Sequence, residues 1–352
     1  MCGKHTALGT VLLAAACGLG IGACAPDERN DVEVEPEGFF AGAEGARLHY
    51  RVVGNGSDTV VVVHGGPGAG SSSVRPDFEP LAERLTLLFF DQRGGGLSEL
   101  PADTTRLRAR FFVEDLDSVR AYFGLDRMNI LAHSFGSVIV ARYAQEHPGR
   151  IGRIVLHGAT GPVRERAARL ARRATPPGPD TTLSRRAGEL LGSLLDGTAS
   201  DPAATCREWE ALNGRMAEAQ GDTIRWRGSS CDAPSEAVGY YFRYTAQLAP
   251  RTFGDWNFTQ GLENVSAPVL VVYSADDDSL AVAEQRAWSS AFPDGRLLLV
   301  PGADKGALAE RPDIVVPAVM EFFTRPDASI SCPREPGVEC SPTVADSGVV
   351  RN

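Results

Sequence analysis

The chain has 352 residues, of which 43% are hydrophobic and 23% are charged, as in ordinary globular proteins rather than disordered or fibrous ones. It carries 35 basic and 45 acidic residues, for a net charge of −10. This balance argues against nucleic acid as a partner, because a nucleic-acid-binding protein needs a basic face to neutralise phosphates. The length is sufficient for one α/β domain with an inserted segment.

The first residues have the pattern of a secretory signal. Lys4 precedes an apolar run of mostly small residues, Ala7–Ala23, and no acidic residue occurs before Asp27. This run is shorter than a good membrane-spanning helix. We therefore expect residues 1–23 to be a signal peptide that directs export.

The signal ends in Ile21-Gly22-Ala23-Cys24, which resembles a bacterial lipobox. The resemblance implies cleavage before Cys24 and lipidation of its thiol. The lipid would hold the protein on a membrane of the bacterial cell envelope, at its periplasmic or extracellular face. A plain secretory signal cleaved nearby and lipidation of Cys17 are the alternatives. Residues 24–37 are rich in proline and acidic residues, which predicts a tether.

Four cysteines follow the predicted lipidation site: Cys206, Cys231, Cys332 and Cys340. An even number in an exported protein predicts two disulfides. Of the three ways to pair them, the most local joins Cys206 to Cys231 and Cys332 to Cys340. No histidine lies near any of the four, so we do not expect a metal site. We also expect no cofactor.

Predicted strands and helices alternate along most of the chain. The strands are Arg47–Val53, Thr59–His64, Leu85–Asp91, Met128–Ala132, Ile151–Leu156, Val269–Tyr273 and Leu297–Val300. Helical spacing of apolar residues occurs over Phe112–Tyr122, Phe135–Glu146, Ala281–Ala291 and Ile314–Phe323. This alternation predicts an α/β fold with a mostly parallel sheet and right-handed crossovers.

The stretch 161–261 has helical patterns and no clear strands. We interpret it as a helical lid inserted into a core formed by residues 38–160 and 262–325. The tail, residues 326–352, is rich in proline and cysteine and is predicted to be irregular.

The strongest local motif is Ala132-His133-Ser134-Phe135-Gly136, between a predicted strand and a predicted helix. It is similar to the nucleophile elbow G-x-S-x-G, with alanine in place of the first glycine. In such an elbow a sharp turn lifts the serine above the sheet, and small flanking residues allow the backbone to come close. Ser134 is therefore the candidate nucleophile, and we interpret His133 as structural.

A second motif, His64-Gly65-Gly66-Pro67-Gly68, ends a buried strand. Glycines allow backbone N–H groups to approach a developing oxyanion, so Gly65 or Gly66 is predicted to form an oxyanion hole together with Phe135. A phosphate-binding loop is the alternative, but the chain lacks its G-x-G-x-x-G or Lys-Ser/Thr pattern here.

These two motifs, with Asp91-Gln92-Arg93-Gly94 between them, resemble the prolyl aminopeptidase (proline iminopeptidase) group of α/β-hydrolases. The resemblance covers residues 40–160 and 262–325. It implies an α/β-hydrolase fold with an inserted helical lid, and acyl transfer through the serine. The implied substrates are peptides with an N-terminal residue such as proline, or small esters and amides. For Asp91 and Arg93 it implies a structural turn beside the active site.

The resemblance also implies positions for the other catalytic residues. The acid of the family follows a late strand in a G-x-x-D pattern, and counting from Ser274 selects Asp277, with Asp276 and Asp278 as alternatives. The histidine of the family follows the last strand, where this chain has Lys305. The implied triad is therefore Ser134, Asp277 and Lys305.

Lysine in place of the histidine of the family leaves three interpretations open. Lys305 acts as the base, as in Ser–Lys hydrolases, because a buried lysine can lower its pKa toward neutrality. Alternatively, Lys305 and Asp277 form an ion pair in a catalytically silent protein that binds a peptide or small ligand under the lid. In the third interpretation another histidine, such as His157, is recruited as the base.

Aminopeptidases of this group bind the α-ammonium of the substrate with carboxylates of the lid. Glu208 and Glu210, in Cys206-Arg207-Glu208-Trp209-Glu210, are the candidates that the resemblance suggests. Several lid aromatics are candidates to line an apolar pocket, or simply to pack the lid. They are Trp226, Tyr240, Tyr241, Phe242, Tyr244, Phe253 and Trp256.

Overall fold

The structure, a computed structural model, describes residues 35–173, 181–219, 221, 226–275, 282–303 and 306–341. The predicted signal peptide 1–23, Cys24 and most of the predicted tether lie outside these ranges. None of the helices in the described ranges is both long and apolar enough to span a membrane.

Within the described ranges, nine strands form one sheet in the order β1-β2-β4-β3-β5-β6-β7-β8-β9. The six strands from β4 to β8 in this order are parallel, and β1, β2 and β9 pair antiparallel at the two edges. The strands are β1 Glu37–Ala41, β2 Arg47–Val53, β3 Thr59–Val63, β4 Thr86–Phe90, β5 Met128–His133, β6 Ile151–His157, β7 Val269–Ser274, β8 Gly295–Val300 and β9 Glu339–Ser341.

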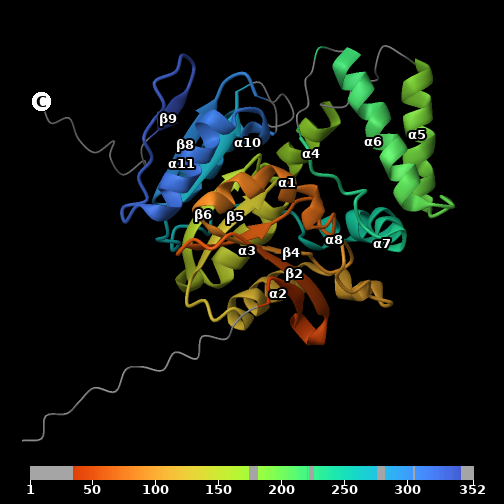
Figure 1. The fold of residues 1–352 in the computed structure, drawn as a ribbon, viewed down its shortest axis with the longest axis horizontal. Coiled ribbons are helices and arrows are strands. Elements are labelled where there is room, and N and C mark those ends of the chain that lie inside the picture. The colour runs from red at the N-terminus through yellow and green to blue at the C-terminus, as the bar shows by residue number, and fades with distance from the viewer. Residues whose placement is uncertain are drawn as a thin grey trace, which may run out of the picture. The chain divides into compact units, whose positions relative to one another are not determined.

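Helices cover the sheet and form the insertion between β6 and β7 (Figure 1). Those of the core are α1 Arg75–Phe78, α2 Ala109–Tyr122, α3 Gly136–Glu146, α9 Val282–Ala291, α10 Ala307–Glu310 and α11 Pro312–Thr324. Those of the insertion are α4 Arg164–Arg173, α5 Thr181–Asp196, α6 Pro202–Ala219, α7 Ser235–Tyr240 and α8 Ala246–Thr252, with a π-helical turn at Tyr241–Thr245.

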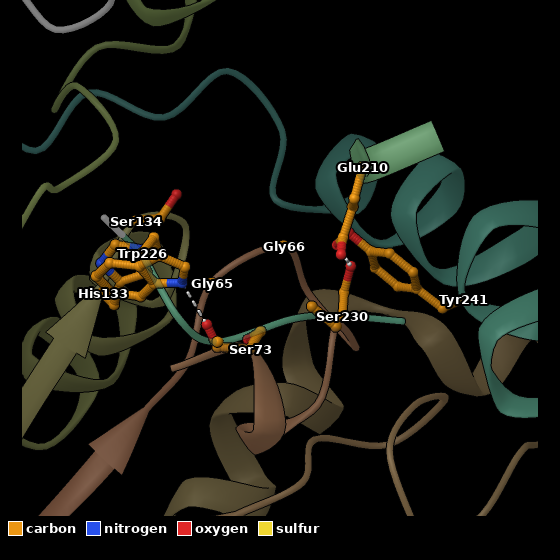
Figure 2. Close-up of a pocket in the computed structure, with 11 residues that line it drawn as sticks. Gly65, Gly66, Ser73, His133, Ser134, Glu210, Trp226, Ser230 and Tyr241 are labelled. Carbon is orange, nitrogen blue, oxygen red and sulfur yellow. Dashed lines mark hydrogen bonds between the residues drawn. The ribbon is translucent and has the colours of Figure 1, made fainter. Parts of the chain in front are cut away.

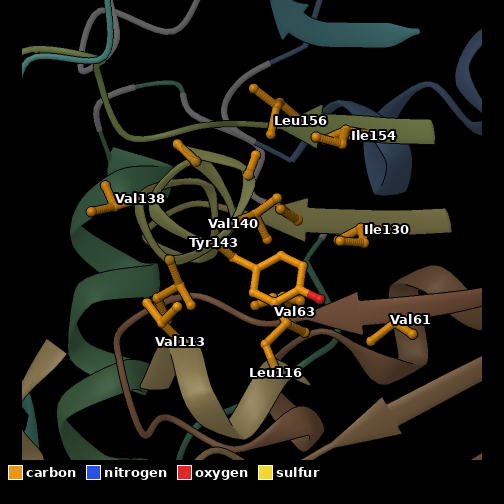
Figure 3. Packing of buried hydrophobic residues seen from close by; sticks show 14 of the residues in the cluster. Val61, Val63, Val113, Leu116, Ile130, Val138, Val140, Tyr143, Ile154 and Leu156 are labelled. Atoms are coloured by element: carbon orange, nitrogen blue, oxygen red, sulfur yellow. The ribbon is translucent and has the colours of Figure 1, made fainter. Parts of the chain in front are cut away.

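Side chains that alternate along the central strands fill two apolar layers. Val61 and Val63 of β3 pack with residues of α2 and α3, as Figure 3 shows. Val60 and Val62 pack on the opposite face with residues of α1 and α11. Burial on both faces explains why these strands are continuously apolar in sequence rather than alternating. The predicted mostly parallel sheet, with helices packed on both faces, is therefore confirmed.

The predicted strands of the sheet are all present, but two edge strands were not predicted. β1 begins at Glu37, the last residue of the predicted tether, and β9 lies in the tail that was predicted to be irregular. β9 is held by pairing with β8, by the Cys332–Cys340 disulfide and by an ion pair between Arg286 and Glu339 at 2.7 Å. These tertiary contacts, rather than local propensity, make the segment a strand.

Both disulfides join the cysteines in the most local pairing. Cys206 and Cys231 lie 25 residues apart and connect α6 to a loop of the lid. Cys332 and Cys340 lie 8 residues apart in the tail. The first disulfide is fully buried within the lid, among Leu194, Val238 and other apolar residues.

A buried ion pair supports the turn after β4. The Arg93 guanidinium donates to both carboxylate oxygens of Asp115 on α2, at 2.6 Å each, and also to the carbonyls of Ala43 and Arg106. Both charged side chains are essentially inaccessible to water. Because each charge depends on the other for compensation, this pair fixes α2 to the Asp91–Gly94 turn.

Candidate active site

Ser134 lies in a strained turn between β5 and α3. Its φ is +51°, in the left-handed region that non-glycine residues seldom adopt. The Ser134 N–H donates to the carbonyl of His157 at 3.2 Å, and its own carbonyl accepts from the Thr160 N–H at 3.1 Å and the Ser137 hydroxyl at 2.7 Å. These contacts with neighbouring segments hold the strained conformation, as expected for a nucleophile elbow.

Close backbone approach explains the glycines around Ser134. A Cβ at position 136 would overlap the carbonyl oxygen of Val63 at the end of β3. A Cβ at position 65 would lie 2.6 Å from the Cβ of Ser134. The Gly65-Gly66 loop therefore lies directly beside the Ser134 side chain. A larger residue at position 65 would push this loop away from Ser134, and one at position 136 would push α3 away from the end of β3.

A cavity of about 240 Å³ opens at this point between the core and the lid. In Figure 2, Ser134 and Glu210 lie on opposite sides of it, with Gly66 between them. Its lining residues are Gly65, Gly66, Ala69, Ser73, His133, Ser134, Glu210, Trp226, Gly228, Ser230 and Tyr241. The structure thus brings together the candidate nucleophile, the glycine loop and one of the two candidate lid carboxylates.

The two lid glutamates have different surroundings. Glu210 accepts hydrogen bonds from the hydroxyls of Ser229 at 2.6 Å and Ser230 at 3.4 Å. Burial raises the pKa of its carboxyl group, and these two hydrogen bonds oppose the shift only in part. Glu208 instead faces solvent and pairs with Arg186 at 2.9 Å. Although the two are separated by one residue, only Glu210 lines the cavity, because they project from different faces of α6.

His133 lines the cavity and forms a pair with His157. Their Nδ1 atoms are 3.1 Å apart, and the Leu308 N–H donates to Nε2 of His157 at 3.1 Å. Because that Nε2 accepts, a neutral His157 carries its proton on Nδ1, from which it can donate to His133. His157 is fully buried, and both of its ring nitrogens lie within hydrogen-bond distance of these neighbours.

Two of the lid aromatics contribute to the cavity wall. Trp226 stacks on His133 with 4.9 Å between ring centroids. The hydroxyl of Tyr241 would lie 2.7 Å from a Cβ at position 66. Burial, and then the charge of Glu210, raises the pKa of Tyr241 to about 12, so the phenol stays protonated at neutral pH. Tyr240 and Tyr244 line a separate hollow. Phe253 and Trp256 are buried in an apolar layer of the core, and Phe242 is buried in the apolar cluster of the lid around the first disulfide.

The turn after β4 holds the glycine loop in place. The side-chain amide of Gln92 donates to the carbonyl of His64 at 2.8 Å, and its oxygen accepts from the Gly68 N–H at 3.3 Å. Asp91 accepts from the Ser71 N–H at 2.6 Å. Burial alone would raise the pKa of Asp91. Hydrogen bonds to its carboxylate, of which the one with His49 has the largest effect, instead lower this pKa to about 2. These contacts give the Asp91–Gly94 segment a structural role.

The remaining candidates lie outside the described residues. These are Asp277, its neighbours Asp276 and Asp278, and Lys305. In sequence, Asp277 follows β7 and Lys305 follows β8, just as Ser134 follows β5. In an open α/β sheet, segments that follow the carboxyl ends of parallel strands meet at one edge.

Some residues of the cavity were not predicted from the sequence. Ser73, Gly228 and Ser230 line it, but their local sequence has no motif that could have identified them.

One group of possible metal ligands lies near the cavity. A carboxylate oxygen of Glu210 and both sulfurs of the Cys206–Cys231 disulfide lie within 4.8 Å of one another. Because those sulfurs are bonded to each other, they do not offer thiolate ligands to a metal.

Curated relatives are similar to this chain over part of its length. A probable proline iminopeptidase from Streptomyces coelicolor is 33% identical over 223 residues, which cover 59% of this chain and 66% of the relative. A proline iminopeptidase from Heyndrickxia coagulans is 35% identical over 120 residues, which cover 34% of this chain and 41% of the relative. The chain therefore matches just under two thirds of the first relative and about two fifths of the second.

Solved structures show the same fold. An esterase from Rhodococcus sp. ECU1013 has a TM-score of 0.56 at 22% identity, covering 83% of this chain and 99% of that one. The proline iminopeptidase of Mycobacterium smegmatis has a TM-score of 0.56 at 18% identity, covering 82% and 97%. The family model for the α/β-hydrolase fold matches residues 58–312. This chain belongs to the α/β-hydrolase fold family.

Proposed function

We propose that this chain is a serine hydrolase that cleaves the bond after an N-terminal residue such as proline, by acyl transfer through Ser134. The observation that carries the proposal is the single cavity in which Ser134, the Gly65-Gly66 loop and Glu210 face one another. A nucleophile opposite a carboxylate suits a substrate whose ammonium group lies a short distance from its scissile carbonyl. The names of the partial relatives agree with this substrate class.

The chemistry begins with a proton transfer from Ser134. Lys305, as the neutral amine, takes the hydroxyl proton while Oγ attacks the carbonyl carbon of the substrate. The negative charge that develops on the carbonyl oxygen is stabilised by the N–H groups of Gly65 or Gly66 and of Phe135. No hydrogen bond from the Gly66 or Phe135 N–H to another residue is found in the part of the chain that the structure describes, which supports this role.

The second half of the reaction returns the proton. The Lys305 ammonium protonates the leaving amine, and an acyl-enzyme ester remains on Ser134. Water then attacks this ester while the amine of Lys305 takes a proton from it. The ester C–O bond breaks, the Lys305 ammonium returns the proton to the Ser134 oxygen, and the free N-terminal amino acid leaves. Asp277 orients Lys305 in this proposal. Lysine can serve here because its pKa falls when it is desolvated, whereas arginine stays charged.

Export and lipid attachment at Cys24 are part of the same proposal. The two disulfides of the chain support it, because disulfides form and persist in oxidising compartments such as the bacterial envelope. A membrane-anchored hydrolase there would act on small peptides or esters in its surroundings.

Glu210→Gln tests the ammonium site. We expect KM for an N-terminal prolyl amide to rise on the order of 10- to 100-fold, because a charge-assisted hydrogen bond is lost. Hydrolysis of a neutral p-nitrophenyl ester should change little. In the parent protein, KM for the amide should rise as the pH falls through the raised pKa of Glu210, since only the carboxylate binds the cation.

Glu208→Gln is the matched control, because Glu208 pairs with Arg186 outside the cavity. Its kinetics should equal those of the parent on both substrates. If Glu210→Gln leaves KM for the amide unchanged, or if both variants lose affinity equally, the ammonium site does not exist at Glu210.

A further inference from the structure

The segment 226–231 of the lid, between α6 and α7, lies against the core, and we call it the strap. On the core side, the backbone N–H of Arg227 donates to both carboxylate oxygens of Asp77, at 3.1 and 3.0 Å. The backbone N–H of Gly228 donates to one of them at 2.7 Å. Asp77 is only 1% exposed. A Cβ at position 228 would overlap the carbonyl of Ser73, so the strap lies directly against the core.

Further hydrogen bonds fix the same end of the strap. The indole N–H of Trp226 donates to the Ser73 carbonyl at 2.7 Å, a bond drawn in Figure 2. The Ser229 N–H donates to the carbonyl of Ser72 at 3.3 Å, and the Ser72 hydroxyl donates back to the Ser229 carbonyl at 3.0 Å. Since Trp226 also stacks on His133, this end forms the cavity wall on the side of the nucleophile.

The other end of the strap is fixed to helix α6. Cys231 is bonded to Cys206, which lies one helical turn before Glu210 and on the same face of α6. Ser229 donates its hydroxyl to Glu210 at 2.6 Å, and its oxygen accepts from the Cys231 N–H at 2.9 Å. The Ser229 hydroxyl, which donates to the Glu210 carboxylate, is thus hydrogen-bonded directly to the backbone of the disulfide-bonded Cys231.

We propose that the Cys206–Cys231 disulfide and Ser229 are positioning residues that aim Glu210 into the cavity, and so set the preference for substrates with a free, cationic amino terminus. This inference rests on the proposed role of Glu210. The disulfide fixes α6 to the strap, the strap is fixed to the core beside the nucleophile, and Ser229 holds the carboxylate at the junction. The distance between the ammonium site and Ser134 is thereby set by one short, doubly anchored segment.

The alternative is that the disulfide only stabilises the lid. In that case loss of the disulfide would weaken the binding of all ligands equally, or would leave the binding of all ligands unchanged. If it positions Glu210, its loss must selectively weaken ligands that carry the ammonium group, because a half-buried carboxylate without its serine donors no longer keeps one orientation.

Equilibrium binding separates these two roles without relying on turnover. The full chain carrying Ser134→Ala is titrated by calorimetry with L-prolinamide, which has a cationic amine, and with N-acetyl-L-prolinamide, which is neutral. The ratio of the two dissociation constants measures the ammonium preference. This ratio is then measured after adding Cys206→Ser with Cys231→Ser, Ser229→Ala alone, Glu210→Gln, or Cys332→Ser with Cys340→Ser.

We expect the ammonium preference to fall about tenfold or more in the Cys206/Cys231 variant and in Ser229→Ala, as for the loss of a hydrogen bond to a charged group. The Cys332/Cys340 variant should keep it, because that disulfide lies in the tail. Should the Cys206/Cys231 variant fail to fold, Ser229→Ala, which removes only one hydroxyl, still decides the matter.

The outcomes distinguish this inference from the function on which it rests. If Glu210→Gln abolishes the preference but Ser229→Ala and the Cys206/Cys231 variant keep it, the positioning role is wrong and the ammonium site stands. If the parent shows no preference for the cation, the ammonium site is wrong and the positioning role is overturned with it.

Discussion

We expect Ser134→Ala to abolish covalent labelling by a fluorophosphonate and to lower kcat/KM for an N-terminal prolyl amide by at least about 10³-fold. Ser134 is the proposed nucleophile, and it lies in a strained turn with φ of +51° at the wall of the cavity. Removal of the hydroxyl leaves oxyanion stabilisation and binding in place, so a small residual rate over water is expected. Gel detection of a fluorescent fluorophosphonate measures the first effect, and initial rates measure the second.

Ser118→Ala is a suitable control for this variant. Ser118 lies on α2, away from the cavity, and donates its hydroxyl to the carbonyl of Glu114 at 2.9 Å. Its labelling and rates should match those of the parent. Labelling that persists in Ser134→Ala would show that another residue is the reactive nucleophile, and the mechanism proposed here would have to be abandoned.

The largest expected effect on stability comes from Asp115→Asn. This change leaves the fully buried guanidinium of Arg93 without a compensating charge. Breaking one side of a buried pair costs about 3–5 kcal/mol, because the remaining charge stays desolvated. Urea unfolding followed by circular dichroism measures the difference in the free energy of unfolding.

The surface pair between Arg106 and Glu44, at 3.4 Å, provides the comparison. Glu44→Gln should change the free energy of unfolding by less than about 1 kcal/mol, because exposed ion pairs are screened by water. Equal effects of the two substitutions would show that the Arg93–Asp115 pair does not support the fold as described. Because Arg93 follows Gln92, which holds the glycine loop, we also expect Asp115→Asn to reduce activity.

The elements predicted from periodicity were those with strong local signals. The buried strands, β3 for example, are continuous apolar runs between turn residues, which a sequence pattern can identify. β1 and β9 have no such run: only Phe40 is buried in β1, and β9 has three half-exposed residues. Sheet order was equally hidden, since β2 pairs with β4 and not with β3, which follows it in sequence.

In the candidate site, too, the features with a local sequence pattern were predicted and those that depend on long-range packing were not. The elbow around Ser134 is local, so its five residues were sufficient to predict it. The choice between Glu208 and Glu210 depends on how α6 is rotated against the strap, which no local pattern contains. Asp77 and the strap are joined by hydrogen bonds between residues about 150 positions apart. Contacts of that range depend on packing, and the sequence alone could not predict them.

In the proposed mechanism Ser134 is an active nucleophile and Lys305 is its base. The most direct test is the rate of fluorophosphonate labelling of the full chain between about pH 6 and 10, since free lysine has a pKa of about 10.4. We expect labelling that requires Ser134 and rises with a midpoint below that of free lysine. A parent protein that is not labelled at any pH, but becomes labelled when Lys305 is replaced by histidine, would contradict it. The elbow would then be intact in a protein that binds its ligand without cleaving it.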